Sequence, residues 1–261
     1  AISSVEAKQL DIPATNIVNS LGGRVPGIVS LQSSGEPGKN LSEFWIRGIG
    51  TFGANSSALV LVDGLEGNLN EIDPADIESF SVLKDASATA IYGSRGANGV
   101  VLVTTKRGES GKLSISTRSN FTFSKLKRLP KYLRAYEYAN LANEARFESG
   151  LTPLYDEVAL ESFKYGLAPN IYPDIDWQAE MLKPTSFQQT HFINARGGGS
   201  VARYYLSMGM SLEPAAYRLE RDSKYASSVA YNTYNYRTNL DMNITKTTTA
   251  YFGVNGYISN T

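Results

Sequence analysis

The sequence predicts an α+β domain, with a small mixed sheet and short helices, followed by antiparallel strands of a transmembrane β-barrel that stays incomplete. Three observations lead to this fold class. The first 108 residues are rich in glycine and alternate short strand-like and helix-like segments. From Leu113 onward apolar and polar residues alternate, as they do in strands with one apolar and one polar face. The connections between these later strands are alternately short and long, which is the arrangement of outer-membrane barrels.

The composition excludes several classes of protein and several kinds of metal site. The chain has 261 residues, with 25 Lys and Arg against 25 Asp and Glu, no cysteine and one histidine, His191. A protein that binds nucleic acid through its whole surface would show a basic excess. Disulfides and thiolate metal sites are excluded, and one histidine leaves little for a histidine-based site. We therefore expect no cofactor and no metal site, except that carboxylates alone could still hold an ion.

Turn and helix signals divide the first 108 residues into elements. Asp63-Gly64 ends a strand, and Asp73-Pro74 opens a short helix in which Asp73 is the N-cap and Ile77 and Phe80 face inward. Gly93 ends an Ala-rich helical turn. The expected strands are 42–46, 58–62, 81–83 and 99–106, and the expected helical turns begin at Asp73 and span 85–92.

Five later segments alternate with period 2. In 202–212 the even positions are apolar, such as Leu206 and Met208, and the odd positions are mostly polar. The same pattern predicts strands over 113–123, 187–195, 234–245 and 250–258. Each has about the 9 to 12 residues with which a tilted strand crosses a bilayer.

The connections between these strands give a second signal. Residues 196–200 and a turn near Lys246 are short, whereas 124–186 and 213–233 are long. Within the first long connection we expect a helix over 132–148 and a short one over 176–182. Because five strands cannot close such a barrel, we expect the sequence to be part of a longer protein.

Charge is unevenly distributed along the chain. Every charged residue from Gly48 to Leu83 is acidic, and from Lys84 to Arg134 eleven basic residues face only Asp85 and Glu109. These stretches are either solvated faces that compensate one another or a docking surface for a partner.

Other motifs give weaker signals. The run 48–53 matches G-x-G-x-x-G, but no helix can follow it, so we exclude a nucleotide site. Asp174 and Asp176 beside Trp177 fit a turn with an N-cap aspartate better than a ligand site. Arg47 and Arg95 stand beside glycines and suit either bidentate contacts to carboxylates across an interface or a surface role. We interpret His191 as a packing residue of its strand.

Several motifs of the first domain resemble one known family. They occur in order: LGGRVPG (21–27), IRGIG (46–50), LVDG (61–64), DPADIES (73–79), VLKDASATAIYGSR (82–95) and ANGVVLVTTK (97–106). Together they resemble the plug domain of SusC/RagA-like, TonB-dependent outer-membrane transporters. The later strands are similar to the start of that family's 22-stranded barrel. The likeness implies a plug over 1–110 and barrel strands over 111–261, with an extracellular loop at about 124–185.

The resemblance implies active import through the outer membrane of a bacterium with two membranes. A SusD-like surface lipoprotein captures an oligosaccharide or a peptide, and TonB, energised from the inner membrane, moves the plug. The segment that contacts TonB would precede or overlap Ala1. No bond of the substrate is made or broken, so the resemblance implies a transporter and not an enzyme. Gly22 and Phe44-Trp45 depart from the family's usual residues, which leaves the substrate open.

The expected topology assigns plug loops to faces. The loops 32–41 and 65–70 would lie on one side of the plug, and the resemblance implies that this side faces outward. The substrate-side candidates are Lys39, Asn40, Glu66, Asn68, Asn70, Tyr172 and Trp177, and Arg47 and Arg95 are candidates for contacts between plug and barrel. Each could instead be a solvated loop residue. A soluble β-rich glycan-binding or adhesion module stays open as the alternative to the transporter.

Overall fold

The computed structural model describes residues 2–6, 17–31, 43–46, 57–127, 129–218 and 229–260. The chain divides into two compact units. Residues 1–122, 187–215 and 229–261 form the first unit, and residues 123–186 and 216–228 form the second.

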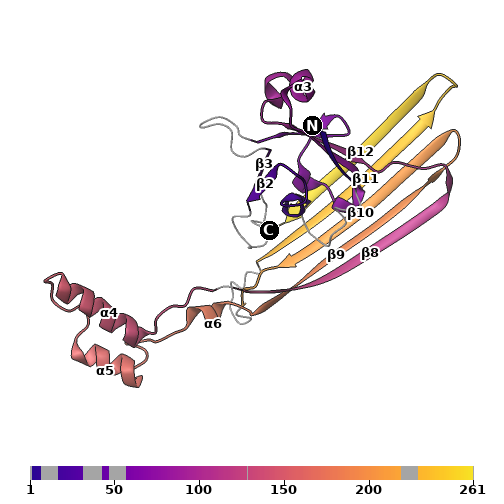
Figure 1. Cartoon of the computed structure of the whole chain (residues 1–261). Helices are drawn as coiled ribbons and strands as arrows, with labels where there is room; N and C mark the ends of the chain where they lie inside the picture. Colours follow the sequence, from indigo (N-terminus) through magenta and orange to yellow (C-terminus); the bar gives the residue numbers. More distant parts are fainter. Residues whose placement is uncertain are drawn as a thin grey trace. The chain divides into compact units, whose positions relative to one another are not determined.

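The first unit contains a mixed sheet of five short strands. These are β1 (Ile2–Glu6), β4 (Leu59–Val62), β5 (Leu65–Glu66), β6 (Ile77–Leu83) and β7 (Val100–Thr105), in the order β1-β6-β7-β4-β5. Only β4 and β7 run parallel. Strands β2 (Ile28–Leu31) and β3 (Glu43–Ile46) form a separate hairpin-like pair (Figure 1). The expected small mixed sheet is therefore confirmed.

Short helices connect these strands and close their core. They are α2 (Ile17–Leu21), η1 (Leu69–Glu71), η2 (Pro74–Asp76), α3 (Ala86–Thr89) and η3 (Ala90–Gly96). Ile17 and Leu21 of α2 pack in one buried cluster with Phe80 of β6 and Val101 and Val103 of β7. Because β7 lies in the middle of the sheet, its Val-Val-Leu-Val run is apolar on both faces, as buried strands are.

The start of β6 corrects one expectation from the sequence. The turn that Asp73 and Pro74 open is a 3-10 turn that ends at Asp76, and the strand begins at Ile77 instead of Ser81. The register of β6 against β7 shifts between Ile77 and Ser79, which is a β-bulge. The bulge turns both Ile77 and Phe80 into the core although they are three residues apart, and this spacing imitates a helix.

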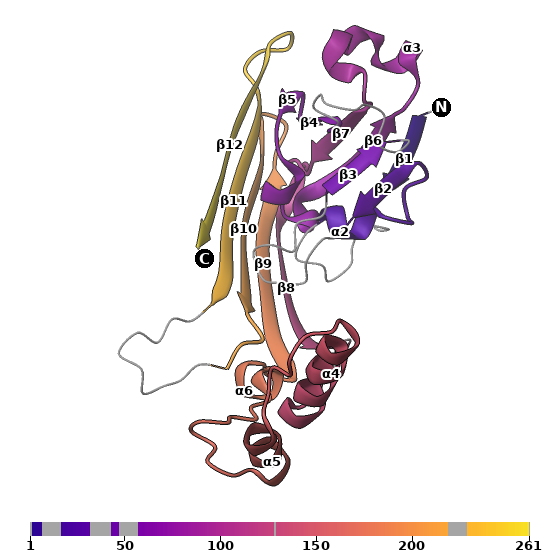
Figure 2. The same ribbon diagram turned by 90° about the vertical axis from the view of Figure 1, so that its left-hand side faces the viewer.

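The rest of the first unit is an antiparallel sheet of five long strands. They are β8 (Gly111–Lys125), β9 (Thr185–Gly198), β10 (Ala202–Pro214), β11 (Ala230–Asn243) and β12 (Thr249–Asn260). Each strand pairs with the next one along the chain, in the order β12-β11-β10-β9-β8 (Figures 1 and 2). All five strands expected from the period-2 pattern are thereby confirmed.

The two faces of this sheet differ as the alternation predicts. The register places Met208 of β10 between Ile193 of β9 and Tyr236 of β11, and all three side chains are exposed, Met208 to 63%. The opposite face carries Tyr205, which is 0% exposed, and Arg237, which is 7% exposed. The small mixed sheet and its loops lie against this second face (Figure 2).

The second unit is mainly helical. It holds α4 (Ala135–Glu148), α5 (Glu157–Tyr165) and α6 (Trp177–Met181), of which α4 and α6 were expected. Helix α5 was not among the expected helices, although Asp156 caps its first turn and Gly166 ends it in the left-handed conformation. No helix in the described part of the chain is both long and apolar enough to span a membrane.

A charge on the apolar face of β12 should destabilise the sheet in a bilayer. Val254 faces outward with Met208, whereas its neighbour Asn255 faces inward beside Glu66 and Glu71. We predict that Val254→Arg costs about 2 to 4 kcal/mol if it lies near the bilayer midplane, and that Asn255→Arg costs less. The measurement is the urea midpoint of each full-length variant folded into lipid vesicles. Equal midpoints would show that this face does not meet lipid.

Candidate functional site

We call the part of the first unit before β8 the plug. The plug contacts the inward face of β11, and we call this face the seat. Every second residue of β11, from Thr233 to Asp241, faces the plug. Thr233 and Asn235 line a pocket with residues 70–74, whereas Arg237, Asn239 and Asp241 contact plug residues between 63 and 107. All five side chains are polar. The plug is therefore held along one strand by a series of polar contacts.

The centre of the seat is a buried cation between two carboxylates. Arg237 Nη1 lies 3.7 Å from Asp63 Oδ2, and its Nε lies 3.8 Å from Asp76 Oδ2. The side chains of Arg237, Asp63 and Asp76 are all less than a tenth exposed. The buried Tyr205 hydroxyl donates a 2.8 Å hydrogen bond to Asp76 Oδ1. Charges taken out of water must compensate one another, so this group fixes how plug and strands meet.

Local backbone structure positions both carboxylates. Asp63 has a φ of 51° and Gly64 of 89°, which places both in the left-handed region of a tight turn between β4 and β5. Asp63 then accepts hydrogen bonds from the backbone N–H of Thr105 at 2.9 Å and from its hydroxyl at 2.6 Å. Asp76 ends the turn that Asp73 caps, and its carbonyl accepts from the N–H of Lys106 at 2.8 Å.

The link from plug to β8 is fixed to the same strands. Asn239, which is 1% exposed, donates to the Lys106 carbonyl at 2.7 Å and to the Thr105 hydroxyl at 3.2 Å. Arg107 forms a 3.1 Å ion pair with Asp241 and stacks over the Tyr251 ring. Gly108 lies so close to the backbone of β10 that a Cβ would come within 2.3 Å of the Tyr204 nitrogen. The end of β7 therefore has no room to shift against β10 and β11.

Burial changes the acidity of two plug carboxyls. Loss of hydration raises the pKa of Asp76, and the hydrogen bond from Tyr205 and the charge of Arg237 only partly offset this. Loss of hydration also raises the pKa of Asp73, against the lowering effect of the Ala75 backbone N–H. Both groups favour protonation more than an exposed aspartate does.

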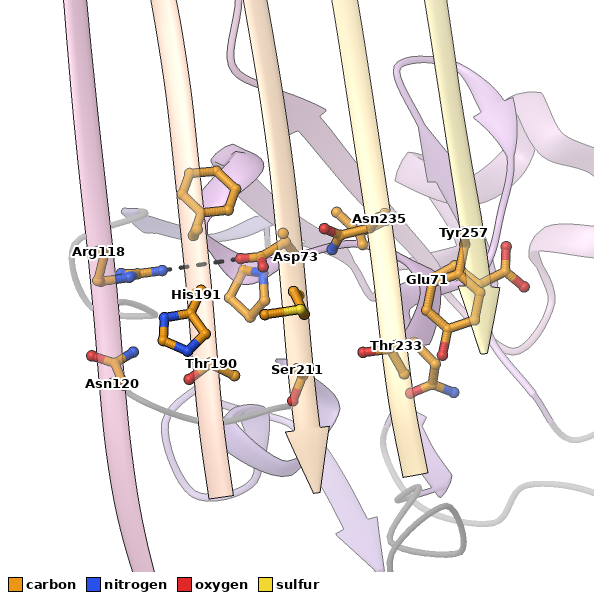
Figure 3. A pocket seen from close by; sticks show the side chains of 16 residues that line it. Glu71, Asp73, Arg118, Asn120, Thr190, His191, Ser211, Thr233, Asn235 and Tyr257 are labelled. Atoms are coloured by element: carbon orange, nitrogen blue, oxygen red, sulfur yellow. Dashed lines mark ion pairs between the residues drawn. The ribbon is translucent and has the colours of Figure 1, made fainter. Parts of the chain in front are cut away.

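A polar pocket lies beside this seat, toward the ends of the strands that carry the long connections. Asn70, Glu71 and Asp73 of the plug face Arg118 and Asn120 of β8. Five more polar residues belong to the wall, namely Thr190, Ser211, Thr233, Asn235 and Tyr257 (Figure 3). The remaining lining residues are Ile72, Pro74, His191, Phe192, Gly209 and Met210. Amide and hydroxyl groups are the most numerous polar groups of this wall, and its charged residues are Glu71 and the pair of Arg118 and Asp73, which are 4.0 Å apart. Such a wall suits uncharged polar groups better than ions.

Two residues of β10 shape the pocket, Gly209 and Ser211. A Cβ on Gly209 would lie 2.1 Å from Asn235 Oδ1 and 2.8 Å from Asp73 Oδ2, so only glycine leaves room for these groups. The hydroxyl of Ser211 is buried, and no group in the described part of the chain is bonded to it. An unbonded buried polar atom is costly unless water or a ligand satisfies it.

The structure places the candidates from the sequence in three settings. Lys39, Asn40 and Arg47 lie outside the described residues. Glu66 forms an ion pair with Arg95, and both residues belong to the plug and are exposed at its surface. A substrate-side candidate and a candidate for barrel contact therefore contact each other. Asn68 caps η1 through the N–H of Asn70, and Asn70 lines the pocket.

The remaining candidates belong to the second unit. Tyr172 meets the Phe163 ring edge-on at 5.6 Å. Trp177, 64% exposed, lines a groove with Tyr132 and Tyr138. Arg134 and Asp174 also line this groove and form a 2.9 Å ion pair. The pKa of Asp174 is lowered, mainly by the hydrogen bond from the Ala135 backbone N–H. Asp176 caps α6, as the turn interpretation predicts.

The period-2 pattern places Tyr205, Arg237 and Asn239 on the polar face of their strands. It does not identify their partners in the plug. The available signal was their position: an aromatic and an arginine near the middle of a polar face need a buried partner. Within the described residues, no three acidic or histidine side chains are arranged to hold a metal ion.

Removing the buried cation should weaken the seat. We predict that Arg237→Met costs about 3 to 5 kcal/mol at neutral pH, because it leaves two buried carboxylates without a cation. A carboxyl whose pKa is raised in the folded state stabilises the protein at low pH, and this stabilisation is lost as the pH rises. The loss of stability caused by Arg237→Met should therefore be smaller at acidic pH. The measurement is protease resistance of the plug in the full-length protein. Arg203→Met, on the same face of β10, is the control, and an equal deficit at both pH values would contradict the prediction.

Comparison with known proteins agrees with this architecture. Residues 1–100 match the family model described as the TonB-dependent receptor plug domain. TonB-dependent receptor P26 of Formosa agariphila is 31% identical over 98% of this chain and 24% of its own length. TonB-dependent receptor SusC of Bacteroides thetaiotaomicron is 31% identical over 88% of this chain and 22% of its own length. The chain thus spans about a quarter of these relatives.

A solved structure extends the match to the strands. The structure described as the RagAB peptide transporter superposes with a TM-score of 0.79 and 26% identity, over 99% of this chain and 30% of that chain. The match includes both the mixed sheet and the long antiparallel strands. The chain therefore belongs to the SusC-like TonB-dependent receptors, of which it contains the plug and a run of barrel strands.

Proposed function

We propose that this chain is part of an active importer that carries oligosaccharides or peptides across the outer membrane. The observation that carries the proposal is the seat: a plug tied to the inward face of strands β10 and β11 through Arg237, Asp63 and Asp76. A plug held in this way blocks the lumen, so passage requires work on the plug. TonB, driven from the inner membrane, supplies that work in this proposal.

We assign the plug to residues 1–110 and the barrel strands to 111–261. The boundary falls between the end of β7 at Thr105 and the start of β8 at Gly111. The long connection at about 124–185 lies outside the cell, because long loops of such barrels are extracellular and short turns face the periplasm. The segment that TonB grips precedes or overlaps Ala1.

The polar pocket is the part of the described lumen that meets substrate. Its amide and hydroxyl groups offer both donors and acceptors, which suits the hydroxyls of a glycan and the backbone of a peptide. The similar structure is described as that of the RagAB peptide transporter, which supports the peptide alternative. A SusD-like lipoprotein delivers either substrate from the outer side. The chain binds and releases, and it catalyses no reaction.

The structure supports some of the substrate-side candidates more strongly than others. Asn70 borders the pocket, and Trp177 offers an exposed ring in the outer loop. Glu66 and Asn68 have structural partners, so replacing them would also disturb the plug. Lys39, Asn40 and Tyr172 remain candidates, as do Arg47 and Arg95 for contacts with the barrel.

Three wall residues test the pocket without touching the buried ion group of Arg237, Asp63 and Asp76. We predict that alanine at Asn120, Thr190 and Thr233 together lowers uptake roughly tenfold, because each hydrogen bond to a ligand contributes about 0.5 to 1.5 kcal/mol. The measurement is growth of a deletion strain, complemented with the full-length gene, on peptides and on oligosaccharides. Uptake should also stop when the proton gradient is collapsed.

The matched control carries alanine on the outward face of the same sheet, at Ile193 and Tyr234. This variant should insert and transport normally. Unchanged uptake in the pocket variant would show that the wall does not meet substrate. A full-length protein that stays monodisperse without detergent would favour the soluble glycan-binding module instead.

A further inference from the structure

The outward face of β8 changes in character toward the end that carries the long connection. Leu113 and Ile115 are exposed aliphatic side chains near the start of the strand, and Phe121 and Phe123 share their face near its end. Lys125, the last residue of β8, has the same parity. Along one face of one continuous strand the order is therefore aliphatic, then two hydroxyl residues, Thr117 and Ser119, then aromatic, then basic.

The aromatic part of this face is well defined. Phe121 stacks on Phe187 of β9 with ring centroids 6.0 Å apart and planes 1° apart. His191 meets Phe121 edge-on at 5.7 Å, and its Nδ1 lies 3.0 Å from the Ser119 hydroxyl. Aromatic side chains of this kind form the belt of a membrane protein at the lipid–water interface.

Three lysines follow this belt. Lys127 comes two residues after Lys125, and Lys183 comes two residues before Thr185, where β9 begins. The Leu126 N–H donates to the Pro184 carbonyl at 3.3 Å, which holds the two chain segments side by side. All three lysines are exposed, and none of them forms an ion pair with another described residue. No acidic residue occurs from Gly111 to Arg134.

This arrangement has the chemistry of a headgroup site. The apolar stems of lysines beside an aromatic belt lie along the acyl boundary, and their ammonium groups extend into the headgroup layer. Each ammonium offers three donors and a full charge to phosphate oxygens. An acidic protein partner would need to approach the same face, but the belt indicates that lipid covers it.

We propose that Lys125, Lys127 and Lys183 bind the phosphate groups of anionic lipid in the outer leaflet, with Phe123 as the adjoining apolar contact. The inference rests on the outer-membrane placement proposed above and goes beyond it, since transport requires no particular lipid.

The test measures which lipid the full-length receptor keeps. The receptor is reconstituted in nanodiscs of phosphatidylcholine mixed with phosphatidylglycerol and then extracted, and the retained lipids are counted. The wild type should retain phosphatidylglycerol in excess. In the Lys125→Gln, Lys127→Gln, Lys183→Gln triple variant this excess should be at least about fivefold smaller. A fivefold change corresponds to the contribution of one lysine near an anionic surface.

Two variants and one competitor make the result decisive. Arginine at the same three positions should keep the excess, and Lys164→Gln on α5 should leave it unchanged. Inorganic phosphate at constant ionic strength should not displace the lipid. Equal retention by wild type and triple variant, or full displacement by phosphate, would overturn the inference. A receptor that inserts without lipid preference contradicts this inference alone, whereas one that never enters a bilayer contradicts the proposed function.

Discussion

The contact between plug and strands depends on Arg237, which lies between Asp63 and Asp76, and all three side chains are less than a tenth exposed. One cation cannot fully compensate two carboxylates, so the Tyr205 hydroxyl and the Thr105 N–H and hydroxyl supply the remaining stabilisation. A buried ion group of this kind adds little net stability compared with a well-packed apolar contact, because each charge has lost its hydration. It does specify one arrangement, since any other leaves a charge unpaired. In the proposed importer, such a contact would hold the plug in one position until TonB moves it.

The order of contacts along β11 extends this constraint over the whole plug. Asp63, Asp76 and Thr105 come from three separate turns or strand ends, yet they meet neighbouring inward residues of one strand. The parallel pairing of β4 with β7 makes this possible, because it brings the end of β4, with Asp63, beside the end of β7, with Thr105. The bulge at the start of β6 then allows the chain to leave the turn at Asp76 with Ile77 already facing the core. The mixed sheet is therefore what gathers the charged groups at one edge.

The sequence predicts the long strands well because a half-buried strand must alternate, and residues 202–212 and 234–245 do so. It misreads the start of β6 because a bulge gives Ile77 and Phe80 a helical spacing. For the site, parity correctly assigns Tyr205 and Arg237 to the inward face, but nothing in one sequence states which plug residue meets them. Glu66 and Arg95 show the same limit: 29 residues separate them, and each alone suits an exposed loop, yet they form a pair. Local periodicity identifies faces, whereas contacts between faces depend on the tertiary fold.

The short turn from Asp73 to Asp76 links the pocket to the buried ion group. Asp73 lies in the pocket wall beside Asn235, and Asp76 holds Tyr205 and Arg237. The Asp76 N–H donates to the Asp73 carbonyl at 2.9 Å, the Ala75 N–H donates to the Asp73 carboxylate at 2.8 Å, and Pro74 fixes its own φ. These restraints make the turn move as one piece. A group that displaces Asp73 in the pocket must therefore also strain the contacts of Asp76, so the lumen wall and the hold on the plug are mechanically one structure.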